Sequence, residues 1–249
     1  MTRSKVRADK LVVEQGLAPT RTRAQALILA GAVCTLDGKR IDKAGTPLDP
    51  EVELRLKGQP IPYVSRGGLK LAKALEHFGV SPQGRICLDV GASTGGFTDC
   101  LLQGGAEKVY AVDVGYNQLA WSLRQDPRVV SLERTNIRTM PPDMIPEPVS
   151  LIVADVSFIS LQLILEPAFK VAEAGAEVVM LVKPQFEVGR AEVGKGGIVR
   201  NEEARQGALE KMIQVFHDYQ LDAVEWMDSP IQGAKGNHEF LLKGVLPKG

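Results

Sequence analysis

The sequence predicts an α/β protein with two parts: a small α/β module, then a seven-stranded, doubly wound sheet with an antiparallel edge hairpin. After residue 65, short apolar segments alternate with helical ones, which is the pattern of a mainly parallel sheet. The last two apolar segments are separated only by the turn 228–236, so we expect them to pair antiparallel. Two helical patterns precede short strands in the first sixty residues. We therefore expect domains at 1–58 and 65–249, joined by a linker at 59–64.

Helix and turn signals define the elements of the first domain. Gly16 stands where a helix commonly ends, Thr22 and Gln25 match a capping box, and Asp37-Gly38 is a strong hairpin signal. Apolar and charged residues alternate from residue 52 onward, as in a half-buried strand. The expected elements are helices at 8–15 and 22–29 and strands at 33–36, 39–41 and 52–56.

The elements of the second domain follow from apolar runs bounded by turn residues. Two prolines and a glycine in GQPIP mark the linker that precedes them. The expected strands are 86–90, 109–113, 129–133, 151–155, 178–182, 223–227 and 239–242, and the expected helices lie around 69–78, 96–103, 117–125, 160–174 and 202–219.

Composition and charge narrow the classes of function. The chain of 249 residues is 44% apolar, has no apolar run of transmembrane length, and starts with a basic segment unlike a signal peptide. Its cysteines (Cys34, Cys87 and Cys100) and its three scattered histidines lack metal-ligand spacing, so we expect no metal site and reduced thiols in the cytoplasm. Residues 1–60 carry 11 Lys and Arg against 7 Asp and Glu, and the remainder carries 19 against 23. A basic N-terminal module suits nucleic acid, although ordinary small domains also show such differences.

The segment 88–98, LDVGASTGGFT, is the strongest signal for a ligand site. A buried strand ends in glycines that open into a helix, which leaves backbone room for a nucleotide-like ligand at the carboxyl edge of a sheet. The spacing fits neither G-x-G-x-x-G nor a P-loop, because no lysine follows Gly96. Acids at Asp89 and Asp113 suit S-adenosylmethionine, with Asp89 at its methionine end and Asp113 at its ribose hydroxyls. The alternative is a tight connection in some other α/β domain.

Eight residues are expected to hold this cofactor. Asn136 is included because it follows the third strand, where adenine contacts come in this kind of fold, although it also reads as an ordinary turn asparagine. The set is Asp89, Gly91, Ser93, Thr94, Gly95, Phe97, Asp113 and Asn136.

Four charged residues stand at strand ends or helix starts near the same edge. Asp155 and Lys183 each follow an apolar strand, Glu239 opens the last strand, and Lys70 lies near the start of a helix. A lysine directly after five apolar residues is unusual, because burying its charge is costly without partners. Each residue also has an ordinary interpretation, as a solvated lysine, a helix cap, a snorkelling strand end or an edge-strand charge.

The first domain resembles the S4 RNA-binding module. The segments Thr22-Arg23-Ala24-Gln25-Ala26 and Gly31-Ala32-Val33 occupy its Ser/Thr-Arg-x-x-Ala and Gly-x-Val positions. The resemblance implies phosphate contacts that position RNA without reading its sequence. A surface helix with solvated arginines is the alternative. The residues expected to bind RNA are Arg7, Arg21, Arg23, Lys39, Arg40 and Arg66.

The four charged residues match the Lys-Asp-Lys-Glu tetrad of FtsJ-like ribose 2′-O-methyltransferases, which makes Lys70, Asp155, Lys183 and Glu239 the expected catalytic residues. Nearly the whole chain is similar to the TlyA (hemolysin A) family, which joins an S4 module to an FtsJ-like domain. The resemblance implies a Rossmann-like, S-adenosylmethionine-dependent enzyme that methylates a cytidine ribose in ribosomal RNA. Longer relatives extend further past Glu239, so we expect the large subunit as target and keep the small subunit as second candidate. The matching stretches include YVSRGGLKL (63–71), ADVSFISL (154–161), LVKPQFEVG (181–189) and GNHEFLL (236–242).

The resemblance also suggests roles for the tetrad. We expect Lys183 to be the base or proton acceptor, Lys70 and Asp155 to place the hydroxyl, and Glu239 to orient the lysines. In the alternative mechanism, the proton of the 2′-hydroxyl leaves late, and the two lysine cations stabilise the developing alkoxide. The loop 187–200 is either a flap that closes on RNA or a plain surface loop.

Three competing functions remain open at this stage. The first is methylation of a base nitrogen or a small molecule, but base methylation usually shows Asp/Asn-Pro-Pro-aromatic where this chain has DVSF at 155–158. The second is hemolysin-type membrane activity, for which no strongly amphipathic apolar segment is seen. The third is a non-catalytic assembly factor for rRNA. We expect ribosomal RNA or a ribosomal subunit as partner, no membrane, and a cytoplasmic location.

Overall fold

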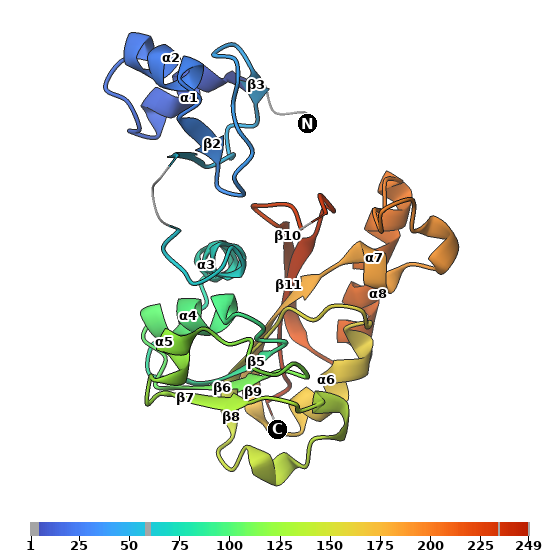
Figure 1. Ribbon diagram of the computed structural model, residues 1–249. Coiled ribbons are helices and arrows are strands. Elements are labelled where there is room, and N and C mark those ends of the chain that lie inside the picture. The colour runs from blue at the N-terminus through green and yellow to red at the C-terminus, as the bar shows by residue number, and fades with distance from the viewer. Residues whose placement is uncertain (1–4, 58–60, 234, 249) are drawn as a thin grey trace. The chain divides into compact units, whose positions relative to one another are not determined.

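The computed structural model describes residues 5–57, 61–233 and 235–248, and the chain divides into two compact units, 1–61 and 62–249. Residues 59 and 60 of the expected linker lie outside the described residues. The N-terminal unit contains two helices that pack over two small antiparallel sheets, each of two strands. Its elements are β1 (Val6–Arg7), α1 (Ala8–Glu14), α2 (Arg21–Leu29), β2 (Val33–Thr35), β3 (Pro47–Leu48) and β4 (Leu54–Leu56) (Figure 1).

Two local expectations for the N-terminal unit differ from the structure. Thr20, not Thr22, caps α2, because its side chain accepts a hydrogen bond from the backbone N–H of Arg23. The segment 39–41 pairs with β2 as expected, but only through a single bridge between Cys34 and Arg40 with flanking backbone hydrogen bonds, so it is not a full strand; the opposite edge of β2 pairs with β4. The hairpin turn at Asp37-Gly38 is nevertheless present, with Gly38 at a φ of +91°.

The second unit is built around a seven-stranded sheet with the order β10-β11-β9-β8-β5-β6-β7. Of these seven strands, β11 alone runs opposite to the other six, and it lies between β9 and β10. This architecture confirms the predicted fold class. The elements are α3 (Gly67–Phe78), β5 (Ile86–Val90), α4 (Gly96–Gln103), β6 (Lys108–Val112), α5 (Trp121–Arg124), β7 (Val129–Leu132), β8 (Val149–Ala154), α6 (Gln162–Phe169), β9 (Ala172–Val182), α7 (Pro184–Glu187), α8 (Glu202–Asp218), β10 (Asp222–Asp228) and β11 (Phe240–Val245), with short 3₁₀ turns at Ile137–Thr139, Pro142–Met144 and Arg190–Glu192.

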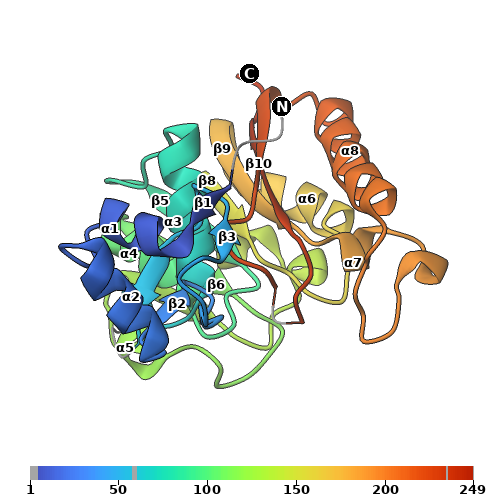
Figure 2. The same ribbon diagram turned by 90° about the horizontal axis from the view of Figure 1, so that it is seen from above.

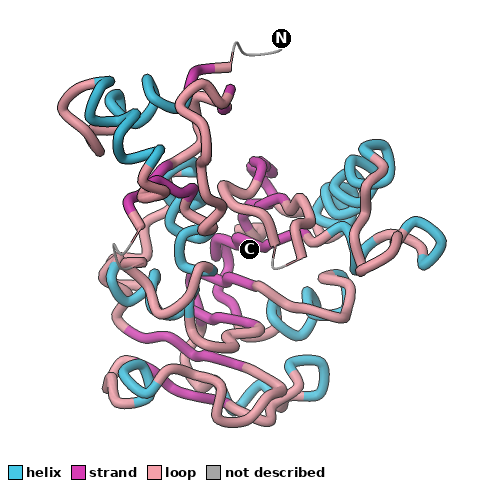
Figure 3. Tube along the Cα trace, turned by 45° about the horizontal axis from the view of Figure 1, so that its top comes forward, coloured by secondary structure: helices cyan, strands magenta, loops and turns pink. Residues whose placement is uncertain are grey.

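Helices cover both faces of this sheet and form a three-layer α/β/α arrangement, seen from above in Figure 2. Helices α3, α4 and α5 pack on one face, and α6 and α8 pack on the other, with the strands between them (Figure 3). Leu71 and Leu101 are fully buried on the first face, and Leu165 and Phe216 on the second. Because both faces are covered, the central strands are apolar throughout, which is why they read as continuous apolar runs in the sequence.

The topology brings the strand ends that carry the candidate site residues to one edge of the sheet. The parallel strands β5, β6, β8 and β9 end there, and β11 begins there because it runs in the opposite direction. Phe240, the first residue of β11, pairs with Val182, the last residue of β9. Residues just after β8 and β9 and just before β11 are therefore neighbours, although they are far apart in the chain.

Two helices are shorter than the sequence predicts. The expected helix 160–174 ends at Phe169, and β9 begins at Ala172, where it pairs with Val149. The sequence AEAGAE favours helix by propensity, but sheet pairing overrides that preference. The expected helix 117–125 is confined to α5, because Asn117 has a φ of +57°.

Candidate active site

The four tetrad residues form two ion pairs at the common strand edge. The Nζ of Lys70 lies 2.5 Å from Glu239 Oε2, and the Nζ of Lys183 lies 2.5 Å from Asp155 Oδ1. Lys183 also donates a hydrogen bond of 2.8 Å to the hydroxyl of Ser157. The structure thus brings together side chains from α3, from the ends of β8 and β9, and from the start of β11.

The two pairs differ in their exposure to solvent. The side chains of Lys70 and Glu239 are 9% and 3% exposed, whereas those of Lys183 and Asp155 are 11% and 23% exposed. Gly233 makes room for the buried carboxylate, because a Cβ there would lie 2.9 Å from Glu239 Cδ. The Lys183–Asp155 pair is therefore the one that an incoming ligand can reach more readily.

Glycines allow the start of α3 to approach the glycine turn closely. A Cβ on Gly96 would lie 2.8 Å from the backbone nitrogen of Gly68, so a larger residue would push the two helices apart. Ser65, in the same approach, would also contact it. This contact explains the glycines of the SRGG segment, and it sets the position from which Lys70 reaches the edge.

Three neighbouring cavities line this edge. The first, of about 300 Å³, lies between the ends of β5, β6 and β8; the second, of about 160 Å³, lies beside the glycine turn; the third, of about 240 Å³, lies near the start of β11. Asp155 lines the first two, Lys183 the last two, and Ser157 lines all three. We name them the nucleoside cavity, the turn cavity and the acceptor cavity.

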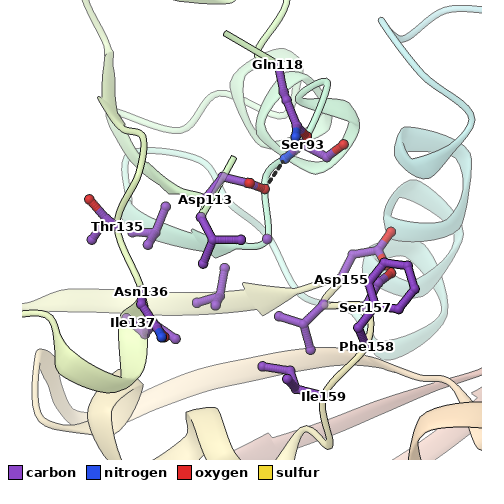
Figure 4. Close-up of a pocket in the computed structure, with 15 residues that line it drawn as sticks. Ser93, Asp113, Gln118, Thr135, Asn136, Ile137, Asp155, Ser157, Phe158 and Ile159 are labelled. Atoms are coloured by element: carbon purple, nitrogen blue, oxygen red, sulfur yellow. Dashed lines mark hydrogen bonds between the residues drawn. The ribbon is translucent and has the colours of Figure 1, made fainter. Parts of the chain in front are cut away.

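Asp113 anchors the nucleoside cavity. Its carboxylate accepts hydrogen bonds from the backbone nitrogens of Ser93, at 2.8 Å, and Gly115, at 2.6 Å. Figure 4 shows Asp113, Asn136 and Asp155 around the cavity, coming from the ends of different strands. Asn136 both lines the cavity and accepts a hydrogen bond from the backbone N–H of Arg138, so the structure shows its turn role as well.

The glycine turn supplies the floor shared by the nucleoside and turn cavities. Gly91 has a φ of +84°, and a Cβ on it would lie 2.9 Å from the carbonyl oxygen of Asp155. Gly91 and Ser93 line both cavities, and the buried Phe97 lines the turn cavity. Only a residue without a side chain fits between the two strand ends, as the sequence pattern predicts.

Three of the expected cofactor residues do not line these cavities. Asp89 is fully buried and accepts a hydrogen bond of 2.6 Å from the Thr98 hydroxyl. Gly95 packs against Leu123 of α5 and against Leu119 just before that helix, since a Cβ on Gly95 would collide with both side chains, and the carbonyl of Thr94 accepts a hydrogen bond from the backbone N–H of Ala120. These three residues therefore hold the backbone of the turn in shape and do not face the cavities.

Asp89 is the most perturbed acid near the site. Burial raises its pKa to about 7, an effect that the Thr98 hydrogen bond opposes and the nearby Asp155 and Asp113 charges reinforce. Its second oxygen, Oδ1, is buried and has no hydrogen-bond partner within the described structure. An unsatisfied buried acceptor next to a glycine turn is a place where a ligand donor or a water molecule is needed.

The residues expected to bind RNA fall into both units. Arg66 lies one helical turn before Lys70, at the start of α3. In the N-terminal unit, Arg40 pairs with Asp42 at 2.9 Å on the surface, and Arg23 and Lys39 are exposed. Arg7 and Arg21 instead both pair with the buried Asp9.

Several residues that line the cavities were not predicted from the sequence. Phe158 lines the nucleoside and acceptor cavities, is 88% exposed, and has a φ of +70°, which is unusual for an aromatic residue. Its ring lies 5.4 Å from that of Phe186. Gln185 lines the acceptor cavity with a buried Oε1 that has no partner in the described structure. The only sequence signal for these residues was their position within two or three residues of Asp155 and Lys183.

Comparison with known proteins identifies both units. The FtsJ-like methyltransferase family matches residues 63–245, which is most of the chain. The chain belongs to the FtsJ-like methyltransferase family. An S4 domain matches residues 6–54. The family assignments made from the sequence motifs are therefore confirmed.

Several relatives of this FtsJ-like methyltransferase span nearly its full length. It is 45% identical over 239 residues to the 16S/23S rRNA (cytidine-2′-O)-methyltransferase TlyA of Mycobacterium tuberculosis, covering 96% of this chain and 89% of that one. It is 46% identical to Hemolysin A of Brachyspira hyodysenteriae, covering 97% and 100%. A solved protein from Streptococcus thermophilus, named only as a candidate hemolysin, is 48% identical with a TM-score of 0.75, covering 99% and 90%.

Proposed function

We propose that this FtsJ-like methyltransferase transfers the methyl group of S-adenosylmethionine to the 2′-oxygen of a cytidine ribose in ribosomal RNA. The observation that carries the proposal is the position of the Lys183–Asp155 pair, between cavities suited to the donor and a cavity open to an acceptor. The M. tuberculosis relative is named for cytidine-2′-O methylation of 16S and 23S rRNA, and a Campylobacter jejuni relative, 37% identical over 186 residues, for 23S rRNA. Because ribosomal RNA is made and assembled in the cytoplasm of bacteria such as these relatives, an rRNA substrate implies a cytoplasmic location for the enzyme.

The residues present fit S-adenosylmethionine. Asp113 lines the nucleoside cavity with a carboxylate, which is a suitable acceptor for ribose hydroxyls. Gly91 leaves the backbone open where the ligand would pass between the nucleoside and turn cavities. Asp89 lines none of the cavities, so its buried carboxylate supports the glycine turn from beneath. The carboxylate-lined nucleoside cavity and the open glycine turn match a ligand that carries a nucleoside at one end.

The acceptor cavity suits a nucleotide. Phe158 presents an exposed ring at its rim, beside Phe186, and aromatic rings of this kind stack with unpaired bases. Lys183 and Lys235 line the same cavity and supply positive charge for an RNA backbone. The segment 155–158 lacks the prolines of base-directed enzymes, which favours ribose over base nitrogen.

The residues of this chain act by positioning the ribose 2′-hydroxyl and by stabilising the negative charge on its oxygen. When bound, S-adenosylmethionine supplies a methyl group on a sulfonium leaving group. Lys183, held by Asp155 and Ser157, can approach the 2′-oxygen with its ammonium and stabilise the negative charge on that oxygen, while the hydroxyl proton leaves late and passes to solvent water beside this partly exposed pair. Lys70 adds a second cation, and Glu239 fixes it in place. The methyl transfer itself then needs alignment of the two reactants, which the shared walls of the cavities provide.

The alternative of membrane activity has no structural support among the described residues, where no helix is both long and apolar enough to cross a bilayer. The alternative of a non-catalytic rRNA-binding factor is tested directly below.

The test is transfer of labelled methyl from S-adenosylmethionine to purified rRNA, followed by mapping of ribose methylation. We expect one ribose-methylated cytidine with the wild-type chain and none with Lys183→Ala. Lys170→Ala is the matched control, because Lys170 is an exposed lysine at the C-terminal end of α6 that pairs with Glu166 of the same helix. Unchanged transfer by Lys183→Ala, or methyl groups on a base nitrogen or on protein, would overturn the proposal.

A further inference from the structure

A fully buried carboxylate in the N-terminal unit holds two exposed arginines. Asp9, in the first turn of α1, has no accessible surface. The side chains of Arg7 and Arg21 are 54% and 57% exposed, and each donates to Asp9 Oδ2 from Nη2 at 3.0 Å. Arg7 also donates from Nε to Oδ1 at 3.0 Å, and Gln25 donates to Oδ2 at 2.8 Å.

This geometry screens the carboxylate from a ligand but leaves the arginines available. Four N–H groups converge on Asp9, three of them on Oδ2, and the residue has no accessible surface, so a ligand cannot reach it. A guanidinium has five N–H groups. Arg7 uses two of them on Asp9 and Arg21 uses one, which leaves donors on both side chains facing solvent.

The carboxylate also holds two like charges close together. Both Nη2 atoms lie 3.0 Å from the same oxygen, so these two nitrogens are at most about 6 Å apart. Without the negative charge between them, the guanidiniums would repel each other and move freely. The Arg7 hydrogen bond keeps the pKa of Asp9 well below its usual range, so the carboxylate stays charged at neutral pH.

We propose that Asp9 is a positioning residue that builds a two-arginine fork from Arg7 and Arg21, and that this fork binds a backbone phosphate of RNA. The inference rests on the proposed rRNA substrate for the identity of the ligand. Arginine pairs bind phosphate with planar, directional donors, and side chains that are already ordered lose less entropy on binding. Asp9 therefore promotes RNA binding although it carries the same charge as RNA.

The sign of this effect makes the proposal testable. Removing an acidic residue from a basic RNA-binding surface ordinarily strengthens binding, because less repulsion remains. We expect Asp9→Asn in the full chain to weaken binding of deproteinised 23S rRNA roughly tenfold, the scale set by freeing two ordered side chains. Glu14→Gln is the matched control, since it removes the same charge from the exposed end of the same helix, where Glu14 pairs only with Lys10 among the described contacts. Glu14→Gln should leave binding unchanged or strengthen it.

A second pair of variants keeps the test valid if Asp9→Asn unfolds the unit. Arg21→Lys preserves the charge but loses the planar fork. Arg23→Lys makes the same change two residues along α2, at a side chain that is also expected to contact RNA but has no described bond to Asp9, so its positive charge is kept and no fork is lost. We expect Arg21→Lys to weaken RNA binding several-fold more than Arg23→Lys, with thermal unfolding of both chains unchanged.

Two results would overturn the proposal: binding by a folded Asp9→Asn chain as tight as that of Glu14→Gln, or equal effects of the two lysine substitutions. These binding measurements do not depend on methyl transfer. A chain that fails to methylate rRNA but shows the Asp9 effect would refute the proposed function and leave the fork intact, and the converse result would do the opposite.

Discussion

Replacing Lys70 by alanine should reduce both methyl-transfer activity and stability, whereas Lys183→Ala should abolish activity with little loss of stability. Lys70 and Glu239 are both nearly inaccessible, so the substitution leaves a buried carboxylate without a counter-charge. Breaking such a pair typically costs about 3–5 kcal/mol. For a unit of this size that corresponds to a fall in Tm of roughly 6–20 °C. The Asp155 side chain remains 23% exposed, so the loss of Lys183 should cost only about 1 kcal/mol.

The double substitution Lys70→Met with Glu239→Leu separates the structural role of the pair from its catalytic role. Replacing a buried ion pair by apolar residues of similar size is often neutral or stabilising, so the double variant should recover most of the lost Tm. Methyl transfer to rRNA should remain absent, because neither residue can then position the acceptor. Thermal unfolding and methyl transfer on the same preparations make the comparison. The reasoning is refuted if Lys70→Ala unfolds within a degree or two of wild type, or if the double variant regains activity.

Other predictions concern individual side chains. The pKa of Asp89 is raised from 3.8 to about 7 in the folded state, so the unfolded chain loses this proton at a lower pH than the folded chain does. The free energy of unfolding should therefore fall by up to about 4 kcal/mol as the pH rises from about 4 to 7. Urea titrations should show this dependence in the wild-type chain and a flatter one in Asp89→Asn. Asp113→Ala should weaken binding of S-adenosylhomocysteine by roughly tenfold or more in calorimetry, whereas an unchanged affinity would remove this residue from the ligand site. Burial raises the thiol pKa of Cys87 and of Cys100 to about 12, so iodoacetamide should modify them only on unfolding; rapid labelling of the native chain, read by mass spectrometry, would contradict their burial.

The features that could be predicted from sequence are those with short-range signals. The strand–glycine–helix pattern around Gly91 predicted both the turn and its place at the sheet edge, because only glycine tolerates that backbone and that contact with the strand ending before Asp155. Charged residues directly after apolar strands, such as Lys183, pointed to the same edge because parallel strands end together. Their catalytic roles stay predictions.

The features that could not be predicted depend on long-range pairing or on surface shape. The segment around Gly175 has the composition of a helix, but its pairing with β8, at Ala172 and Glu177, and with β11, at Glu177, makes it a strand. Phe158 looks like a core residue in the sequence, yet its positive φ places the ring in solvent. Asp9 reads as an ordinary helix-start acid, and its contact with Arg21 joins two helices across a loop that no periodicity describes.

The reversed direction of β11 has a consequence for the newly made protein. Lys70 is synthesised in the first third of the chain, whereas its counter-ion Glu239 emerges only with the final strand, which must insert between β9 and β10. A nascent polypeptide can thus bring Asp9 and Arg21 together while Lys70 still lacks its partner. The Lys70–Glu239 ion pair therefore forms only after β11 has been made, well after the N-terminal unit is available to fold.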